Sequence, residues 1–182
     1  MLKPQDLLVA LKFASLPKAE KITFAILAES LSMSVSEVFA ATKRAKVCRL
    51  IIEGPSTGAS DYRPSALNLR EFLLGGLRYV FPVEPGKATR GFLTAQDAFP
   101  LSKHLVRPVI ELPLVWPHPE GDTRGFSIEP IFPSAPNAAR KDERLSTWLT
   151  LSDAIRVGDA RVRMLAATEI GKLIENIDHI RL

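Results

Sequence analysis

Hydrophobic residues in the first part of the chain recur at three- and four-residue spacing, which predicts amphipathic helices. The first helix begins at Pro4, where the missing N–H of proline costs nothing, and it ends before Pro17. A second helix is predicted over residues 22–32 and a third from Val35 to about Cys48. A short apolar strand at 50–52 follows, so the chain opens with three helices and a strand.

The start of the third helix carries a specific signal. The run Ser34-Val35-Ser36-Glu37 has the S-x-x-E pattern of a capping box, in which the serine and glutamate satisfy each other's backbone N–H groups. About three residues, 32–34, separate the second helix from the third. This spacing is typical of a helix-turn-helix, in which two helices meet at a steep angle.

The run 24–38 resembles the corresponding helices of bacterial winged-helix regulators, including the MarR-like group. The small residue at the helix crossing is Ala28, the apolar residue in the turn is Met33, and a further apolar residue is Val38. Ser32 stands where these regulators usually have glycine. The resemblance covers roughly 50 of the 182 residues.

The resemblance implies that the third helix enters the major groove of double-stranded DNA. Residues 34–49 hold four basic side chains and one acidic one. The alternative is a solvated cationic helix end, which the helix dipole favours without any ligand. The hydroxyls expected at phosphates or base edges are those of Ser34 and Ser36; Thr42, Lys43, Lys46 and Arg49 are expected at phosphates, and Arg44 at a guanine edge or a phosphate.

The net charge of +4 is concentrated at the same end of the chain. Residues 1–80 contain 11 Lys and Arg against seven Asp and Glu, which accounts for the whole excess. Residues 81–182 contain 13 of each kind. This distribution favours a polyanionic partner at the N-terminal end, although an excess of four charges also arises by chance.

The stretch 53–60 is rich in turn-forming residues and has neither Lys nor Arg nor a clear returning strand. It therefore predicts a truncated wing or a plain linker. An apolar helix is predicted from Pro64 to about Leu77, and a loop-rich region over 79–118.

Residues 110–116 and 124–131 are predicted to be strands joined by the turn 117–122 into a β-hairpin. Helices resume near Pro136, with one broken at Gly158 and a last one capped by Asp159. The predicted fold class is α+β, with a helix-turn-helix domain at 1–62 and a mixed dimerisation, effector or partner-binding region at 63–182. The resemblance implies a homodimer formed through the terminal helices.

Several kinds of chemistry lack their usual sequence signals. The three histidines are far apart and lack metal-ligand spacing, and a single cysteine, Cys48, excludes a disulfide within the chain. Nucleophile-elbow and zincin motifs are missing, as are a signal peptide and an apolar run of ~20 residues. We therefore expect a cytoplasmic protein without metal, cofactor or membrane partner, and not an enzyme.

The function predicted from these features is that of a bacterial-type, sequence-specific DNA-binding transcriptional regulator acting as a repressor. One alternative is a protein-interaction module, such as an antitoxin or complex subunit, that binds a protein with the same shape. Another is an enzyme with a site in the central proline-rich region. The enzyme alternative predicts a pocket ringed by Arg90, His118, Arg124 or Glu129.

Overall fold

The computed structural model describes residues 1–17, 21–55, 58–105 and 111–178. It has an α+β fold with two small sheets. The N-terminal region contains three helices and a two-stranded sheet: α1 (Pro4–Ser15), α2 (Phe24–Leu31), α3 (Val35–Val47), β1 (Ile51–Glu53) and β2 (Tyr62–Pro64).

The junction between α2 and α3 has the local geometry that the sequence predicts. The Ser34 hydroxyl accepts from the Glu37 N–H at 3.2 Å, and the Glu37 carboxylate accepts from the Ser34 N–H at 3.2 Å. Ser32 has φ +52° and ψ +46°, the left-handed conformation that usually favours glycine. This turn lets α2 and α3 meet at 101°.

A returning strand, which the sequence did not reveal clearly, follows β1 beyond the turn-rich stretch 53–60. β2 pairs antiparallel with β1, in the register Ile51 with Pro64 and Glu53 with Tyr62. Each strand has only three residues, which is too short for an alternating hydrophobic pattern to stand out in the sequence.

A long helical segment comes next and begins at α4 (Ala66–Glu71), two residues after the predicted start at Pro64. It continues through a π-helical turn at Phe72–Gly76 into α5 (Leu77–Val80). Leu69, Leu73 and Leu77 are fully buried, which explains why this segment is so apolar.

The second sheet contains β3 (Ala88–Leu93), β4 (Leu114–Pro117) and β5 (Thr123–Ser127). β3 pairs antiparallel with both other strands, and β4 pairs parallel with β5, so the sheet closes on itself. The predicted β-hairpin was therefore wrong, because β4 and β5 run in the same direction. β3 lies in the region predicted to be loops, and Ile110 lies outside the described residues.

Two glycines allow the closed sheet to be this small. A Cβ atom on Gly121 would lie 2.3 Å from the Cα of Gly91, and one on Gly91 would lie 2.0 Å from the Trp116 carbonyl oxygen. Because backbone approaches backbone here, no side-chain movement could relieve either clash.

The C-terminal region contains three helices: α6 (Ala135–Lys141), α7 (Glu143–Val157) and α8 (Ala160–Asp178). α7 ends at Gly158, as predicted. The carboxylate of Asp159 accepts from the Val162 N–H at 2.8 Å, which confirms the predicted cap.

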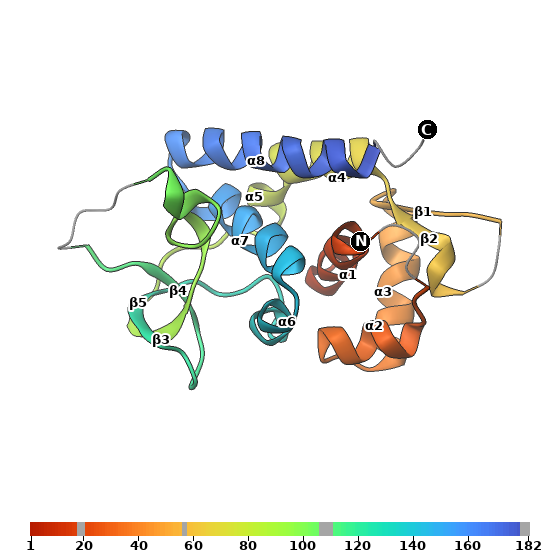
Figure 1. The fold of residues 1–182 in the computed structure, drawn as a ribbon, viewed down its shortest axis with the longest axis horizontal. Helices are drawn as coiled ribbons and strands as arrows, with labels where there is room; N and C mark the ends of the chain where they lie inside the picture. Colours follow the sequence, from red (N-terminus) through yellow and green to blue (C-terminus); the bar gives the residue numbers. More distant parts are fainter. Residues whose placement is uncertain (18–20, 56–57, 106–110, 179–182) are drawn as a thin grey trace.

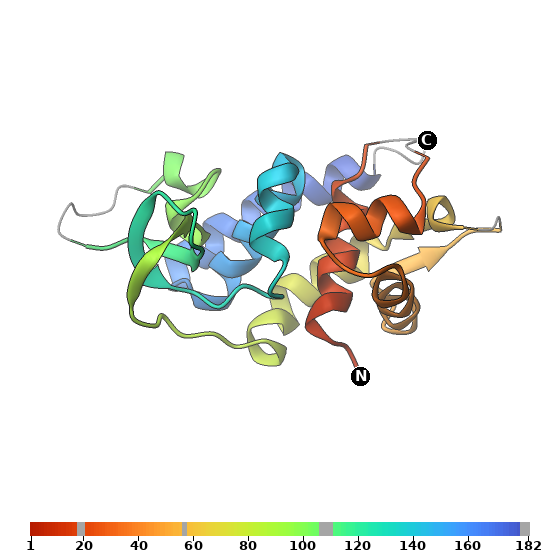
Figure 2. The same ribbon diagram turned by 90° about the horizontal axis from the view of Figure 1, so that it is seen from below.

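The N-terminal helices and the closed sheet lie at opposite ends of the molecule, with α7 between them and α8 running beside α4 (Figures 1 and 2). One continuous hydrophobic core includes residues of both ends, because α7 packs against α1 as well as against α8. Within the described ranges, no single helix is long and apolar enough to span a membrane. The bent pair α2 and α3 reaches that length and apolar character only when its two helices are counted together.

Candidate nucleic-acid interface

The candidate interface is the outward side of α3 together with the adjoining β1–β2 ladder, and we refer to it as the α3 surface. α3 packs against the core through Val38, Ala41 and Ala45, which are fully buried. The side chains on its opposite side are therefore exposed. The side chains of the α3 surface are Val35, Ser36, Phe39, Lys43, Lys46, Val47, Glu53 and Arg63.

A single carboxylate links the helix to the ladder. Glu53 forms ion pairs with Lys46 and with Lys43, the second at 3.5 Å, and it accepts a hydrogen bond from the Tyr62 hydroxyl. The Lys43 ammonium also donates to the Tyr62 hydroxyl oxygen at 2.8 Å. Both lysine side chains are 46% exposed, so water and a ligand can still reach their ammonium groups.

The protonation of this cluster follows from its hydrogen bonds. The bonds from Lys46 and then Tyr62 lower the pKa of Glu53 to about 2. The bond to Tyr62 raises the pKa of Lys43, against the opposing effect of burial. At neutral pH the cluster therefore holds two cations and one anion, and its net charge is positive.

The N-terminus of α3 is less suited to a phosphate than the sequence suggests. The Ser34 hydroxyl is engaged with Glu37, and the Glu37 carboxylate occupies the first turn, where a phosphate would bind. Ser36 is exposed, and its hydroxyl lies 3.3 Å from that of Ser34. Of the two serines, Ser36 is therefore the better placed to contact a ligand.

Two of the predicted DNA contacts need correction. Thr42 is fully buried and its hydroxyl donates to the Val38 carbonyl at 2.8 Å, so it does not lie on the outward face. The guanidinium of Arg44 forms an ion pair with the buried carboxylate of Asp6 in α1. Its Nε and Nη2 atoms donate to Oδ1 of Asp6 at 3.0 Å and 2.6 Å. Arg44 thus joins α3 to α1 instead of projecting toward a ligand.

Arg49 is exposed just beyond α3, with a left-handed φ of +61°. Arg63 was missed as a candidate because it lies on β2, the strand that the sequence did not reveal. It is exposed and opposite Ile52 in the ladder, which adds a cation beyond those of the helix. The only sequence signal that could have indicated this strand was the short run Tyr-Arg-Pro after a turn-rich stretch.

The α3 surface also has an apolar component. Val35 is 49% exposed, Phe39 46% and Val47 81%. Phe39 packs edge-on against Phe24 with ring centroids 5.2 Å apart, and the Lys43 ammonium lies 5.4 Å from the Phe39 centroid. The surface thus offers aromatic and aliphatic contacts between its positive charges.

The residues named for an enzymatic site lie in and around the closed sheet. Arg90 and Arg124 are opposite each other on β3 and β5, and the ring of His118 packs on Phe92 at 4.8 Å. In the parts of the chain that the structure describes, no group of three His, Cys, Asp or Glu could hold a metal ion; His179 lies outside them.

Comparisons with protein-family models, with curated proteins and with solved structures found no match for this chain.

Proposed function

We propose that the chain is a sequence-specific DNA-binding transcriptional regulator that acts as a repressor, with α1 to β2 serving as a winged-helix domain. The observation that carries this proposal is the pairing of two features. α2 and α3 meet at 101° across a short turn, and the outward side of α3 holds exposed Ser36, Lys43 and Lys46. A helix presented in this way fits the major groove.

In this proposal the lysines neutralise phosphates while Ser36 and Phe39 contact base edges. Lys43 and Lys46 lie on one side of α3 because they are three residues apart. Arg63 on β2 and Arg49 beyond the helix extend the positive charge to either side. A phosphate would compete with Glu53 for the two ammonium groups, so binding exchanges one anionic partner for another.

The test is selection of duplexes from a random-sequence pool, followed by affinity measurements at several salt concentrations. For the best duplex we expect Lys43→Ala/Lys46→Ala to weaken binding and to reduce the slope of log K against log salt by about 2, or slightly less. The matched control is Lys87→Ala/Lys141→Ala, which removes two exposed lysines elsewhere and should leave the slope unchanged. If no duplex binds the wild type even at low salt, the proposal fails.

We also propose that the regulator is a homodimer. Large apolar side chains are exposed on the elements around α8: Leu67 is 71% exposed on α4, Tyr79 74% on α5 and Met164 64% on α8. A second copy would cover such side chains, and a dimer that reads two half-sites needs its two α3 helices ~34 Å apart, one turn of DNA. Light scattering should give twice the mass of one chain, and Leu67→Glu/Met164→Glu should reduce it to a monomer.

The exposed Val35, Phe39 and Val47 favour a second candidate, a module that binds a protein through the α3 surface. The lysine variant separates the two candidates. A protein-binding module would tolerate Lys43→Ala/Lys46→Ala, whereas the affinity of a DNA reader for its duplex would fall; Phe39→Asp would weaken binding in both cases.

A further inference from the structure

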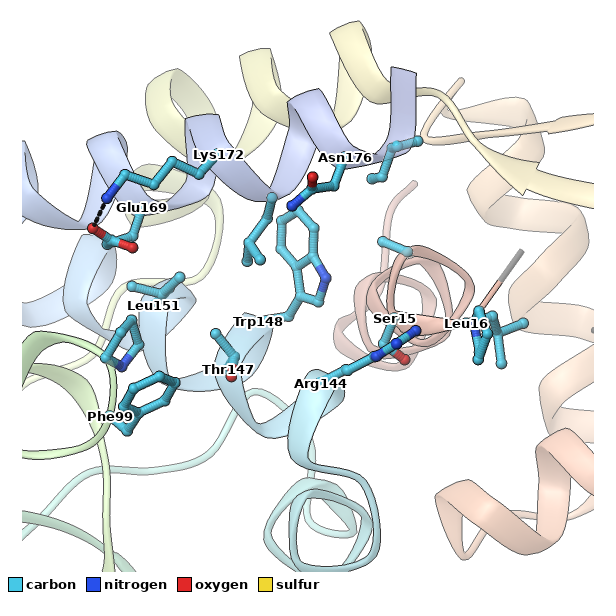
Figure 3. A pocket seen from close by; sticks show the side chains of 15 residues that line it. Ser15, Leu16, Phe99, Arg144, Thr147, Trp148, Leu151, Glu169, Lys172 and Asn176 are labelled. Atoms are coloured by element: carbon cyan, nitrogen blue, oxygen red, sulfur yellow. Dashed lines mark hydrogen bonds and ion pairs between the residues drawn. The ribbon is translucent and has the colours of Figure 1, made fainter. Parts of the chain in front are cut away.

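A cavity of about 610 Å³ lies away from the α3 surface, between the end of α1, residues 99–100, α7 and α8 (Figure 3). Its volume falls in the range of about 300–1,000 Å³ that is usual for small-molecule sites. α1 contributes Ser15 and the residues just before and after it, and the two C-terminal helices contribute most of the rest.

The walls of the cavity are mainly apolar, and helical periodicity explains why. Arg144, Trp148 and Leu151 follow each other at four- and three-residue spacing, so they share one face of α7. Leu173 and Ile177 share a face of α8 in the same way. Apolar side chains on all sides of the cavity include Leu16, Phe99, Trp148, Leu151, Leu173 and Ile177.

The two tryptophans of the chain differ in one respect. Trp116 is buried and its indole N–H donates to the Asp153 carboxylate at 2.6 Å. Trp148 is 2% exposed, yet its indole N–H has no hydrogen-bond partner among the described residues. In Figure 3 the indole nitrogen of Trp148 is directed toward the side of the cavity where Ser15 and Arg144 lie. The nitrogen is therefore open to the cavity and is not sealed in the core, so a ligand atom that accepts a hydrogen bond can take the place of water there.

The charges at the mouth of the cavity point to the kind of acceptor. Lys172 is paired with Glu169 at 2.6 Å, so these two balance each other. Arg144 is exposed, and no described residue forms an ion pair with it. Its side chain extends across the cavity toward Ser15 (Figure 3). The Ser15 hydroxyl donates to the Lys12 carbonyl at 2.8 Å and lies 3.3 Å from the Asp142 carboxylate. On this side of the cavity, Arg144 and Trp148 are donors without a partner among the described residues, and the Asn176 amide is a further donor on α8.

We propose that this cavity binds an apolar carboxylic acid. Its carboxylate accepts hydrogen bonds from the Arg144 guanidinium and the Trp148 indole N–H, and its hydrocarbon body lies against Leu151, Leu173 and Phe99. An anion is favoured over a neutral polar group because hydrogen bonds between ions are roughly twice as strong as neutral ones. The proposal does not depend on whether the chain binds DNA.

The experiment is calorimetric titration of the full chain with naphthoate, and with naphthamide as a neutral probe of the same shape. We expect naphthoate to bind at least about tenfold more tightly than naphthamide, since the amide lacks the charge that Arg144 complements. Octanoate, an acid without an aromatic ring, should displace naphthoate. Equal binding of the acid and the amide, or no binding of either acid, overturns the proposal.

Two variants locate the bound acid. Arg144→Gln, an exposed change that leaves the core intact, should weaken naphthoate about tenfold and leave naphthamide unchanged. Trp148→Phe keeps an aromatic ring in the wall while removing the N–H, and should weaken naphthoate by a smaller factor. The control Arg124→Gln removes an exposed arginine from β5 and should have no effect.

Full affinity for naphthoate in Arg144→Gln overturns the proposal, because the acid would then be bound elsewhere. A second copy of the chain could instead occupy the cavity. That arrangement would appear as a dimer that Leu173→Glu splits and that naphthoate cannot disrupt, and it too overturns the proposal.

Discussion

Glu53 and Asp153 are both carboxylates that accept hydrogen bonds from basic and aromatic side chains, but they lie in opposite surroundings. Glu53 is at the surface, where Lys46 and Tyr62 lower its pKa to about 2. Asp153 is 2% exposed, and burial raises its pKa although Arg156, Thr94 and Trp116 all donate to it. The same kind of cluster therefore produces opposite shifts, and solvation decides the sign.

The two clusters consequently suit different purposes. A surface cluster costs little to rearrange, since water replaces any partner that leaves. The Asp153 cluster joins α7 to β4 and to Thr94, the residue just after β3, and Arg156 extends it by donating to the carbonyls of Phe81 and Glu129. Removing one member in the core leaves the others buried without partners. The Asp153 cluster thus holds the closed-sheet end of the fold to α7, while the Glu53 cluster can exchange partners.

The largest effect is expected for Asp153→Ala. The change leaves the buried Arg156 guanidinium and two neutral donors without their acceptor, so we expect a loss of about 3–5 kcal/mol in the free energy of unfolding. Thermal and urea denaturation measure it, with a fall in Tm of about 10 °C. Asp153→Asn should lose less because it can still accept hydrogen bonds. The control Glu175→Ala, exposed on α8, should change the Tm little.

The next effect concerns Arg44, whose guanidinium holds the buried Asp6. Arg44→Ala should lower the free energy of unfolding by about 2–3 kcal/mol, because Asp6 then keeps, among the described residues, only the Lys3 N–H, at 2.8 Å, as a donor. The loss is smaller than for Asp153→Ala because the Arg44 side chain is 30% exposed and water can enter. Urea denaturation of Asp6→Ala, Arg44→Ala and the double variant gives the coupling energy. If the losses in free energy of unfolding of the two single variants add up to that of the double variant, the Arg44–Asp6 interaction contributes no coupling energy.

A smaller effect is expected on DNA affinity, and it follows from the proposed function. Glu53→Gln removes the anion with which a phosphate must compete, so affinity should rise about threefold at low salt and the gain should fade at high salt. Fluorescence anisotropy with the selected duplex measures this. Glu175→Gln makes the same charge change far from the α3 surface. A decrease in affinity for Glu53→Gln would mean that Glu53 positions the lysines for DNA.

The smallest effect is the pH dependence of stability contributed by Glu53. Its pKa is lowered from 4.5 to about 2 in the folded chain, so this contribution is present above about pH 4.5 and is lost as the pH falls toward 2. The Tm of the wild type should therefore approach that of Glu53→Gln over this window. A constant difference in Tm from pH 6 to pH 3 would contradict the assignment.

Local signals predicted the helices of this molecule well. The capping box at Ser34, the proline at the start of α1 and the Asp159 cap each act over three or four residues, so the sequence alone locates them. The sequence located the turn between α2 and α3 but did not fix the conformation of Ser32, because serine seldom adopts the left-handed φ that glycine does.

Pairings between distant residues could not be predicted in the same way. The closed sheet depends on β3, whose partners lie more than 20 residues away and run parallel to each other. Part of the α3 surface was misassigned for the same reason. Arg44 reads as a free cation until its partner Asp6, 38 residues earlier, is brought beside it. The cavity beside Trp148 could not be predicted either, because its walls come from α1, α7 and α8, which are brought together only in the folded chain.

The contact between Gly91 and Gly121 also has a consequence for finding other chains with this fold. Neither position can accept a Cβ atom, and 30 residues separate them in the sequence. Any chain that builds the same three-stranded closure must therefore keep a glycine before the end of its first strand and another in the turn that follows its second. This spaced glycine pair is a steric signature, and it could identify distant relatives whose remaining residues have diverged.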